Sequence, residues 1–370
     1  MTTATTTADD EAPAFSELRE RLWQAVIDCD ELSALSLVRA AADTGACDPV
    51  QVRRAAERIL LDLIAPTQRR VGTEWAANKI TVAQEHAATA INERCISALA
   101  DATAHALPET SRGRVVVACV DGEWHALPAR LVAEVLRLRG WRVDYLGAQV
   151  PTEHLVAHLH HTGADAVLLS SSIPTHLPIA HTAISACQAI GVPVLAGGAA
   201  FGEDGRYARA MRAEWALDAA GAHLALAQGL ERPKADAARL PDRDLPHLND
   251  QEYTMVRRVK RQLVKQALAD VEDGFPAMRD YSEFQRERTV EDIDYIVSYL
   301  ATALYVDDAD LFTTFVTWTA GILEARRVPA ASLQPVLVSL LRQLSDFPRA
   351  VSILDQSRVA LTDLRSGQTS

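Results

Sequence analysis

The stretch RVVVACV (114–120), followed by DGEWHALP (121–128), decides how the fold of this 370-residue chain is interpreted. RVVVACV is an apolar run rich in β-branched residues, which is typical of a buried strand in a parallel sheet. The segment ALPARLVAEVLRLRG (126–140) has the apolar spacing of an amphipathic helix that stops at Gly140. His125 therefore lies in a loop between a strand and a helix. In an open α/β sheet, ligands bind at that edge.

The alternation of strand and helix continues along the chain. Further strands are predicted at 142–147, 165–171, 192–196 and 215–218, and helices begin near 127, 152, 177, 204 and 220. Five successive strand–helix units predict a doubly wound, parallel, five-stranded sheet. This Rossmann-like domain is expected to span residues 112–230.

Helical segments are predicted on both sides of the sheet. Residues 14–107 have 3.6-residue apolar spacing, with Thr81 and Gln84 placed as a capping box, and predict a four-helix bundle. Residues 231–248 are Pro-rich and aperiodic, which predicts a linker, and 249–370 predict an all-α domain. Residues 1–13 are Thr-rich and acidic and predict a disordered tail. The expected fold class is thus a multidomain α and α/β chain.

Composition excludes several classes of function. The net charge of −12 argues against a direct nucleic-acid interface, because phosphate binding needs clustered Lys and Arg. No apolar run is long enough to span a membrane, and the N-terminus lacks the pattern of a signal peptide. The five cysteines show no CxxC spacing, so we expect reduced thiols and a cytoplasmic protein.

Three loops at the carboxyl ends of predicted strands carry the chemistry. The first holds Asp121, Glu123 and His125; the second is SSSIPT (170–175); the third is GGAAFG (197–202). Taken singly, each has a simpler explanation, since a loop His is usually a surface residue and a Gly pair is usually a turn. Their occurrence at successive loops of one sheet edge predicts a ligand site there.

These loops resemble the cobalamin-binding domain of the methionine-synthase type. That family has Asp-x-His-x-x-Gly in the first loop, Ser-x-Leu after strand three and Gly-Gly after strand four. The resemblance implies that His125 is the lower axial ligand of cobalt. It also implies that Ser170 contacts the dimethylbenzimidazole tail, and that Gly197 and Gly198 line the slot for that tail.

The match has departures. Glu123 replaces the family's Asp, and its carboxylate can still accept the imidazole N–H and orient the ring. Pro128 replaces the Gly of the first loop, and Ser172 replaces the Leu of the second. These changes put the fit of the loop against the corrin in question and leave cobalt ligation expected. Asp121, at the start of the loop, is a further candidate contact to the cofactor.

The helical region adds a second resemblance. Nine residues separate Trp75 from Glu85-His86, and this Trp-x9-Glu-His pattern is similar to the helical cap of CarH-type light sensors, which bind adenosylcobalamin. The match implies that all three residues lie at the upper face of the cofactor. The simpler alternative is a core Trp and a surface Glu-His pair. The chain also departs from those sensors, because Ala76 replaces a His found in some of them and no helix-turn-helix is expected ahead of the bundle.

The C-terminal helical segment is similar to globin-like domains of bacterial sensors. The last Cys of the chain is Cys187 and the last His is His247. Residues 249–370 therefore contain no His that could bind a haem iron and no thiol that could attach a bilin through a thioether. A cobalamin domain followed by such a domain resembles the photocobilins, which implies a non-covalent bilin such as biliverdin. Candidate contacts are Arg257 and Arg261 for the propionates, and Tyr295, Tyr299 and Trp318 for packing. The alternative is a solvated charged face and core aromatics.

Three functions remain open on this basis. The first is a light-responsive signalling protein, not an enzyme, that breaks the Co–C bond of adenosylcobalamin and passes a domain rearrangement to a separate partner. The second is a corrinoid carrier for methyl transfer. The third is a cobalamin sensor indifferent to light. We expect a homodimer that contacts neither nucleic acid nor membrane.

Overall fold

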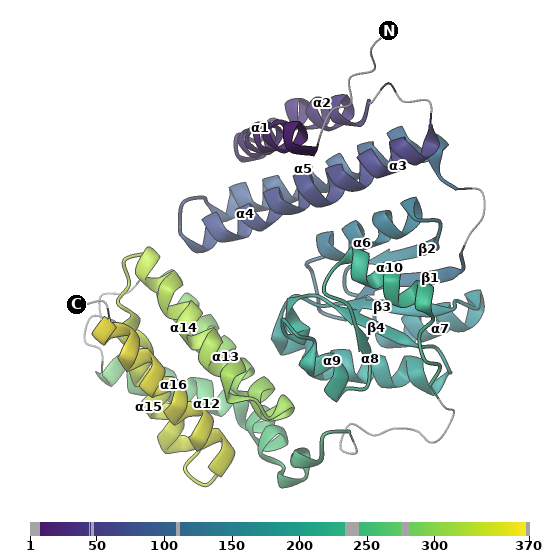
Figure 1. Ribbon diagram of the computed structural model, residues 1–370. Helices are drawn as coiled ribbons and strands as arrows, with labels where there is room; N and C mark the ends of the chain where they lie inside the picture. The colour runs from purple at the N-terminus through teal and green to yellow at the C-terminus, as the bar shows by residue number, and fades with distance from the viewer. Residues whose placement is uncertain are drawn as a thin grey trace.

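A computed structural model describes residues 8–43, 45, 48–108, 112–233, 244–274, 278 and 282–367. Three parts follow one another along the chain (Figure 1): a helical bundle, a domain built on a β-sheet, and a C-terminal helical domain. None of the helices in these ranges is both long enough and apolar enough to cross a membrane. The predicted fold class is confirmed.

The bundle comprises α1 (Ala8–Ile27), α2 (Glu31–Ala42), α3 (Pro49–Arg58), α4 (Ala65–Ala76) and α5 (Val82–Thr103), with η2 (Ala104–Ala106) at its end. A π-helical turn, η1 (Ile59–Ile64), joins α3 to α4 without a break, so the two appear as one long helix in Figure 1. The predicted capping box of Thr81 and Gln84 is present at the start of α5. Because α1 begins at Ala8, the predicted disordered tail is wrong for residues 8–13, and residues 1–7 lie outside the described ranges.

The sheet has five parallel strands in the order β2-β1-β3-β4-β5. They are β1 (Arg114–Cys119), β2 (Arg142–Gly147), β3 (Ala166–Ser170), β4 (Val194–Gly197) and β5 (Glu214–Trp215). This order reverses between β1 and β3, and the loops that leave those two strands flank the usual ligand site of such a sheet.

Helices cover both faces of the sheet, which explains the continuous apolar run of β1. Val115, Val117 and Cys119 pack toward α6 (Leu127–Leu138) and α10 (Ala219–Gln228). Val116 and Ala118 pack toward the opposite face, which is covered by α7 (Thr152–Thr162), α8 (Leu177–Ala189) and α9 (Arg206–Ala210). A strand buried on both faces has no polar alternation.

The C-terminal domain is entirely helical over its described residues, as predicted. It comprises η5 (Pro246–Asp250), α12 (Glu252–Gly274), α13 (Glu283–Val306), α14 (Ala309–Ala325), η7 (Ala330–Leu333), α15 (Gln334–Gln343) and α16 (Pro348–Gly367). Of the predicted linker, 234–243 lies outside the described residues, whereas Leu245 and Leu248 are buried. The linker therefore ends earlier than predicted. Globin-likeness stays a prediction.

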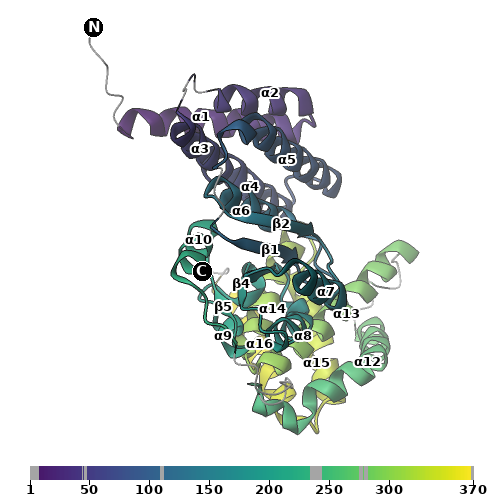
Figure 2. The ribbon, with the colours of Figure 1, turned by 90° about the vertical axis from the view of Figure 1, so that its right-hand side faces the viewer.

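Both helical parts pack directly on the sheet domain (Figure 2). On one side, Leu127, Leu131 and Val135 of α6 belong to the core of the bundle. On the other side, the core beneath α8 continues into the C-terminal domain. There the fully buried His181 of α8 forms a 2.9 Å hydrogen bond between its Nδ1 and the Tyr305 hydroxyl of α13.

Candidate functional site

Glu123 and His125 form the centre of the site, in the loop between β1 and α6. Glu123 Oε1 lies 2.6 Å from His125 Nδ1 and accepts a second hydrogen bond, of 2.9 Å, from the His125 backbone amide. The carboxylate is fully buried, whereas the imidazole is 57% exposed. The loop thus fixes one ring nitrogen and leaves the other, Nε2, toward the open side.

The second carboxylate oxygen joins this loop to the one after β3. Glu123 Oε2 accepts hydrogen bonds from the backbone amides of Ser172 (2.6 Å) and Ile173 (3.1 Å) and from the hydroxyl of Ser171 (3.1 Å). His176 Nδ1, in η3 (Pro174–His176), is 3.4 Å from the same oxygen. One buried carboxylate therefore holds the two loops at the point where the strand order reverses.

The environment determines the charges of the pair. Burial raises the pKa of Glu123, but the hydrogen bonds from His125, His176 and the backbone amides outweigh it and hold that pKa well below its usual range. The bond to Glu123 raises the pKa of His125 against the effect of burial, and the charges of Glu123 and Glu85 act in the same direction. Glu123 is thus an anion that accepts the Nδ1–H of the imidazole.

The two glycines after β4 allow the close approach of the β3 loop. Gly197 pairs with Ser170 across β3 and β4. Gly198 has φ +98°, and a Cβ at this position would lie 2.3 Å from the Ser171 carbonyl oxygen. Only glycine fits there without displacing the loop that holds Glu123. Ser170 itself is half-buried at the end of β3.

The upper-face candidates gather at the turn between α4 and α5, which we call the Trp75 corner (Trp75, Glu85 and His86). Trp75 is half-buried and packs against the bundle core. Glu85 Oε2 lies 2.7 Å from His86 Nδ1, and the Glu85 charge raises the pKa of His125. One carboxylate of the Trp75 corner thus acts on the ring that the sheet domain offers as a ligand.

The C-terminal domain also reaches this corner. The guanidinium carbon of Arg326, just after α14, lies 5.1 Å from the centre of the Trp75 ring. Its two terminal nitrogens lie 3.4 Å from the carbonyl oxygens of Ala76 and Trp75, and Asn78 donates a 3.3 Å hydrogen bond to the Ala325 carbonyl. Figure 1 shows the end of α14 beside the end of α4.

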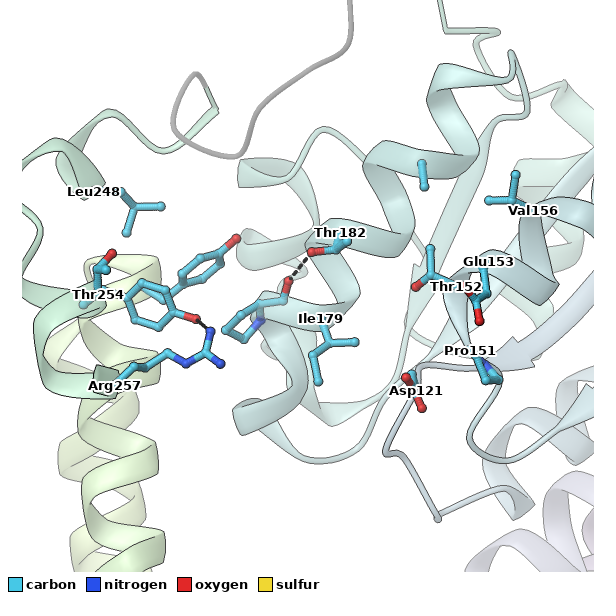
Figure 3. A pocket seen from close by; sticks show the side chains of 14 residues that line it. Asp121, Pro151, Thr152, Glu153, Val156, Ile179, Thr182, Leu248, Thr254 and Arg257 are labelled. Atoms are coloured by element: carbon cyan, nitrogen blue, oxygen red, sulfur yellow. Dashed lines mark hydrogen bonds between the residues drawn. The ribbon is translucent and has the colours of Figure 1, made fainter. Parts of the chain in front are cut away.

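The five predicted bilin contacts do not share one pocket. Arg257 lines a groove of about 900 Å³ between α12 and the α7–α8 side of the sheet domain, with Asp121 on the far wall (Figure 3). Arg261 is exposed on the same helix. The three aromatic candidates, Tyr295, Tyr299 and Trp318, lie on α13 and α14 and do not line that groove.

Sequence reasoning missed two residues that contact Glu123 and one that contacts Trp75. Ser171 and His176 both reach Glu123, whereas the resemblance concerns Ser170 and Ser172 within the SSSIPT loop. A His shortly after that loop was a usable signal. No local sequence pattern indicates the contact of Arg326, because this residue is 251 positions away in the chain from Trp75, whose carbonyl it contacts.

Comparisons with known proteins agree with this layout. Residues 113–221 match the B12 binding domain family, and residues 18–100 match a second family of the same description. The HTH-type transcriptional repressor CarA of Myxococcus xanthus is 28% identical over 162 residues, which are 43% of this chain and 50% of that protein. CarH of the same organism is 37% identical over 97 residues, 25% of this chain and 30% of that protein. The chain thus spans half or less of each repressor.

Corrinoid proteins are also similar. Dimethylamine corrinoid protein 1 of Methanosarcina acetivorans is 26% identical over 162 residues, 44% of this chain and 72% of that protein. The monomethylamine corrinoid protein of Methanosarcina barkeri superposes with a TM-score of 0.46 at 19% identity, covering 58% of this chain and 98% of that one.

The residues of the site fit a corrinoid cofactor. An imidazole whose Nδ1–H is held by a carboxylate presents a lone pair on Nε2, which is the donor that a metal requires. The Gly198 contact and the exposed His125 ring lie at one edge of the sheet, in the loops that follow β4 and β1. With B12 binding domains at residues 18–100 and 113–221, the chain is a cobalamin-binding protein related to both the CarA and CarH repressors and the corrinoid proteins.

Proposed function

We propose that this protein is a light-responsive signalling protein that holds adenosylcobalamin between the bundle and the sheet domain. His125 would bind cobalt from below, Glu123 would orient its imidazole, and Trp75 would cover the upper ligand and exclude water. The cofactor supplies a Co–C bond that light breaks. The protein contributes the contacts that change when the upper ligand is lost.

The contact of Arg326 with Trp75 is the observation that carries this proposal. Arg326 holds both the ring and the backbone at the end of α4. Any displacement of Trp75 must therefore either break its contacts with Arg326 or move the end of α14 with it. Loss of the upper ligand would in this way reach a domain that does not itself bind the corrinoid. The output would pass to a separate partner or to a second copy of the chain.

The alternative of a methyl carrier is less well supported by this contact. A carrier must expose the upper face of its cofactor to an enzyme that delivers or removes a methyl group. Here the residue placed over that face is itself contacted by α14, and the C-terminal domain shares a continuous core with the sheet domain. A carrier needs no such third domain.

For a bilin, an aromatic surface on α13 and α14 is the better candidate than the Arg257 groove. The rings of Tyr299 and Phe315 are stacked with centres 3.7 Å apart. One turn along each helix, Tyr295 is 56% exposed and Trp318 is 51% exposed. Burial, Tyr295 and the Glu123 charge together raise the pKa of Tyr299 to about 12. The helix α13 that carries Tyr295 and Tyr299 packs against η3, in the loop that follows β3. Flat tetrapyrroles stack on such rings.

The test is an absorption spectrum of the protein reconstituted with adenosylcobalamin and biliverdin, in the dark and after red light. We expect a retained bilin band and corrinoid bands that change under red light. A change under blue-green light only would leave a cobalamin light sensor without a bilin. Cobalamin binding with no spectral response to light would contradict the proposed photoreceptor function. A methyl-transfer assay would then distinguish a methyl carrier from a light-independent cobalamin sensor.

Hydrogen exchange supplies a second readout. Backbone amides of residues 74–80 and 322–328 should exchange faster after illumination, because they flank the Arg326–Trp75 contact. If the cofactor is photolysed but exchange in both segments stays unchanged, the signal does not travel through Arg326.

A further inference from the structure

A second cavity lies at the edge of the sheet opposite His125. It has a volume of about 610 Å³ and is lined by residues of α3, α10 and the loops that precede β1 and β2. Arg112 stands before β1 and Gly140 before β2, so the cavity opens at the amino ends of the strands. It touches both the bundle and the sheet domain and shares no residue with the site of Glu123 and His125.

The charge of this cavity is opposite to that of the chain. Of the described residues that line it, Arg53, Arg54, Arg112 and Arg139 are positively charged and Glu57 alone is negatively charged. Four positive charges and one negative charge leave a surplus of three, within a chain whose net charge is −12. Like charges gathered in a concave site repel one another and attract anions.

Two of these arginines are held in place without being neutralised. Arg53 Nη1 donates a 2.7 Å hydrogen bond to the Ala106 carbonyl, and Arg112 Nε donates a 3.2 Å bond to the Arg139 carbonyl. A carbonyl fixes the orientation of a guanidinium but leaves its charge and its other N–H groups available. Such pre-orientation lowers the entropy cost of binding a ligand.

The remaining two arginines differ. Arg139 is paired with Glu57 through two hydrogen bonds, one of them 3.0 Å from Nε to Oε2. Arg54 is exposed and contacts no acceptor among the residues that the structure describes. Among the residues that the structure describes, no carboxylate pairs with three of the guanidinium groups that line the cavity, those of Arg53, Arg54 and Arg112.

His223 adds a neutral donor. Trp141 Nε1 donates a 3.1 Å hydrogen bond to His223 Nδ1, so the ring hydrogen is carried by Nε2. Burial lowers the pKa of His223, the charges of Arg139 and Arg112 lower it further, and Glu57 opposes them. The ring lines the cavity in its uncharged form and can donate from Nε2.

We propose that this cavity binds a small molecule that carries a di- or triphosphate group. Guanidinium groups bind phosphate oxygens in pairs, and a single carboxylate or monophosphate would leave most of the surplus charge uncompensated. The volume lies within the usual range for small-ligand sites. Because Arg53 and Arg54 belong to α3 and Arg112 to the sheet domain, the bound anion bridges the two domains that enclose the cobalamin site.

Calorimetric titration of the full chain with inorganic pyrophosphate and with inorganic phosphate, at constant ionic strength, tests this site. We expect one pyrophosphate per chain, bound at least tenfold more tightly than phosphate. The double variant Arg54→Gln/Arg112→Gln should weaken pyrophosphate binding at least tenfold. Both side chains are exposed, so thermal unfolding should show a folded protein.

The matched control is Arg19→Gln/Arg21→Gln, which removes two exposed charges from α1, outside the cavity. Its pyrophosphate affinity should equal that of the unmodified chain. Equal weakening in both double variants would mean general charge attraction and would overturn the proposal. Non-saturable binding in the unmodified chain would also overturn it. Duplex DNA is titrated in parallel. If Arg54→Gln/Arg112→Gln weakened the binding of DNA and left pyrophosphate affinity unchanged, the arginines would belong to a nucleic-acid surface and the proposal would be overturned.

Discussion

Glu123 Oε1 lies 2.6 Å from His125 Nδ1, and the same carboxylate holds the loop after β3 through Oε2. The side chain that orients the cobalt ligand is thus also the one that joins the two loops of the site. Glu123→Gln should weaken cobalamin binding about 10- to 100-fold, since the amide is a poorer acceptor and brings an N–H against the amides of the β3 loop. Equilibrium titration with the cofactor measures this. Glu153→Gln, at a position whose side chain is 84% exposed, is the control and should bind normally.

Gly198→Ala should destabilise the sheet domain. The added Cβ would lie 2.3 Å from the Ser171 carbonyl, at φ +98°. Backbone strain of this kind costs about 1–3 kcal/mol before the steric clash is added, so the unfolding temperature should fall by several degrees. The neighbouring variant Gly197→Ala places its Cβ at 3.4 Å from the Ala216 carbonyl and should unfold close to the unmodified protein. Equal melting temperatures for the two variants would refute the close approach.

The contact between α8 and the C-terminal domain should weaken in mild acid. Burial lowers the pKa of His181, although Asp244 acts in the opposite direction. Below the ordinary His pKa of about 6.5 the unfolded chain binds a proton that the folded chain does not, so stability falls as pH falls. The slope for this group is at most about 1.4 kcal/mol per pH unit.

Denaturant unfolding between pH 7.5 and 5.5 measures the effect of His181. His181→Gln keeps a hydrogen-bonding side chain opposite Tyr305 and removes the titrating ring. Its stability should depend less on pH than that of the unmodified chain. Parallel curves for the two proteins would show that His181 does not contribute.

Arg326→Gln should loosen the connection between the C-terminal domain and the Trp75 corner. The substitution removes the cation above the indole ring, an interaction worth about 0.5–1 kcal/mol at a partly exposed site. Amides of residues 322–328 should exchange faster in the dark, while cobalamin affinity stays nearly unchanged. Arg258→Gln, at an exposed position of α12, is the control. Unchanged exchange in Arg326→Gln would place the coupling elsewhere.

The sheet could be predicted well from the sequence for a physical reason. A parallel strand buried on both faces requires a continuous β-branched run, so β1 and the helix after it have distinct patterns. Capping by Thr81 is likewise local. Local patterns also placed His125 and the glycine pair at one edge, because strand direction alone brings those loops together.

Contacts between domains could not be predicted in this way. Periodicity tells which face of a helix is apolar but not which neighbour covers it, so nothing local indicated that Arg326 meets Trp75. The predicted bilin contacts do not lie together for the same reason. Arg257 lines the groove toward α7 and α8, whereas Tyr299 of α13 stacks on Phe315 of α14.

The central claim is that His125 supplies the nitrogen ligand of cobalt. It is tested most directly by the electron paramagnetic resonance spectrum of the protein, labelled with ¹⁵N-histidine and loaded with the Co(II) form of the cofactor. A nitrogen-14 ligand splits each cobalt line into a triplet, whereas a nitrogen-15 ligand splits it into a doublet. We predict doublets in the labelled protein, triplets in the unlabelled one, and loss of the doublets in labelled His125→Ala, which distinguishes His125 from the other labelled histidines. Triplets in both would show that the cofactor's own base remains on cobalt, and would contradict the assignment of His125.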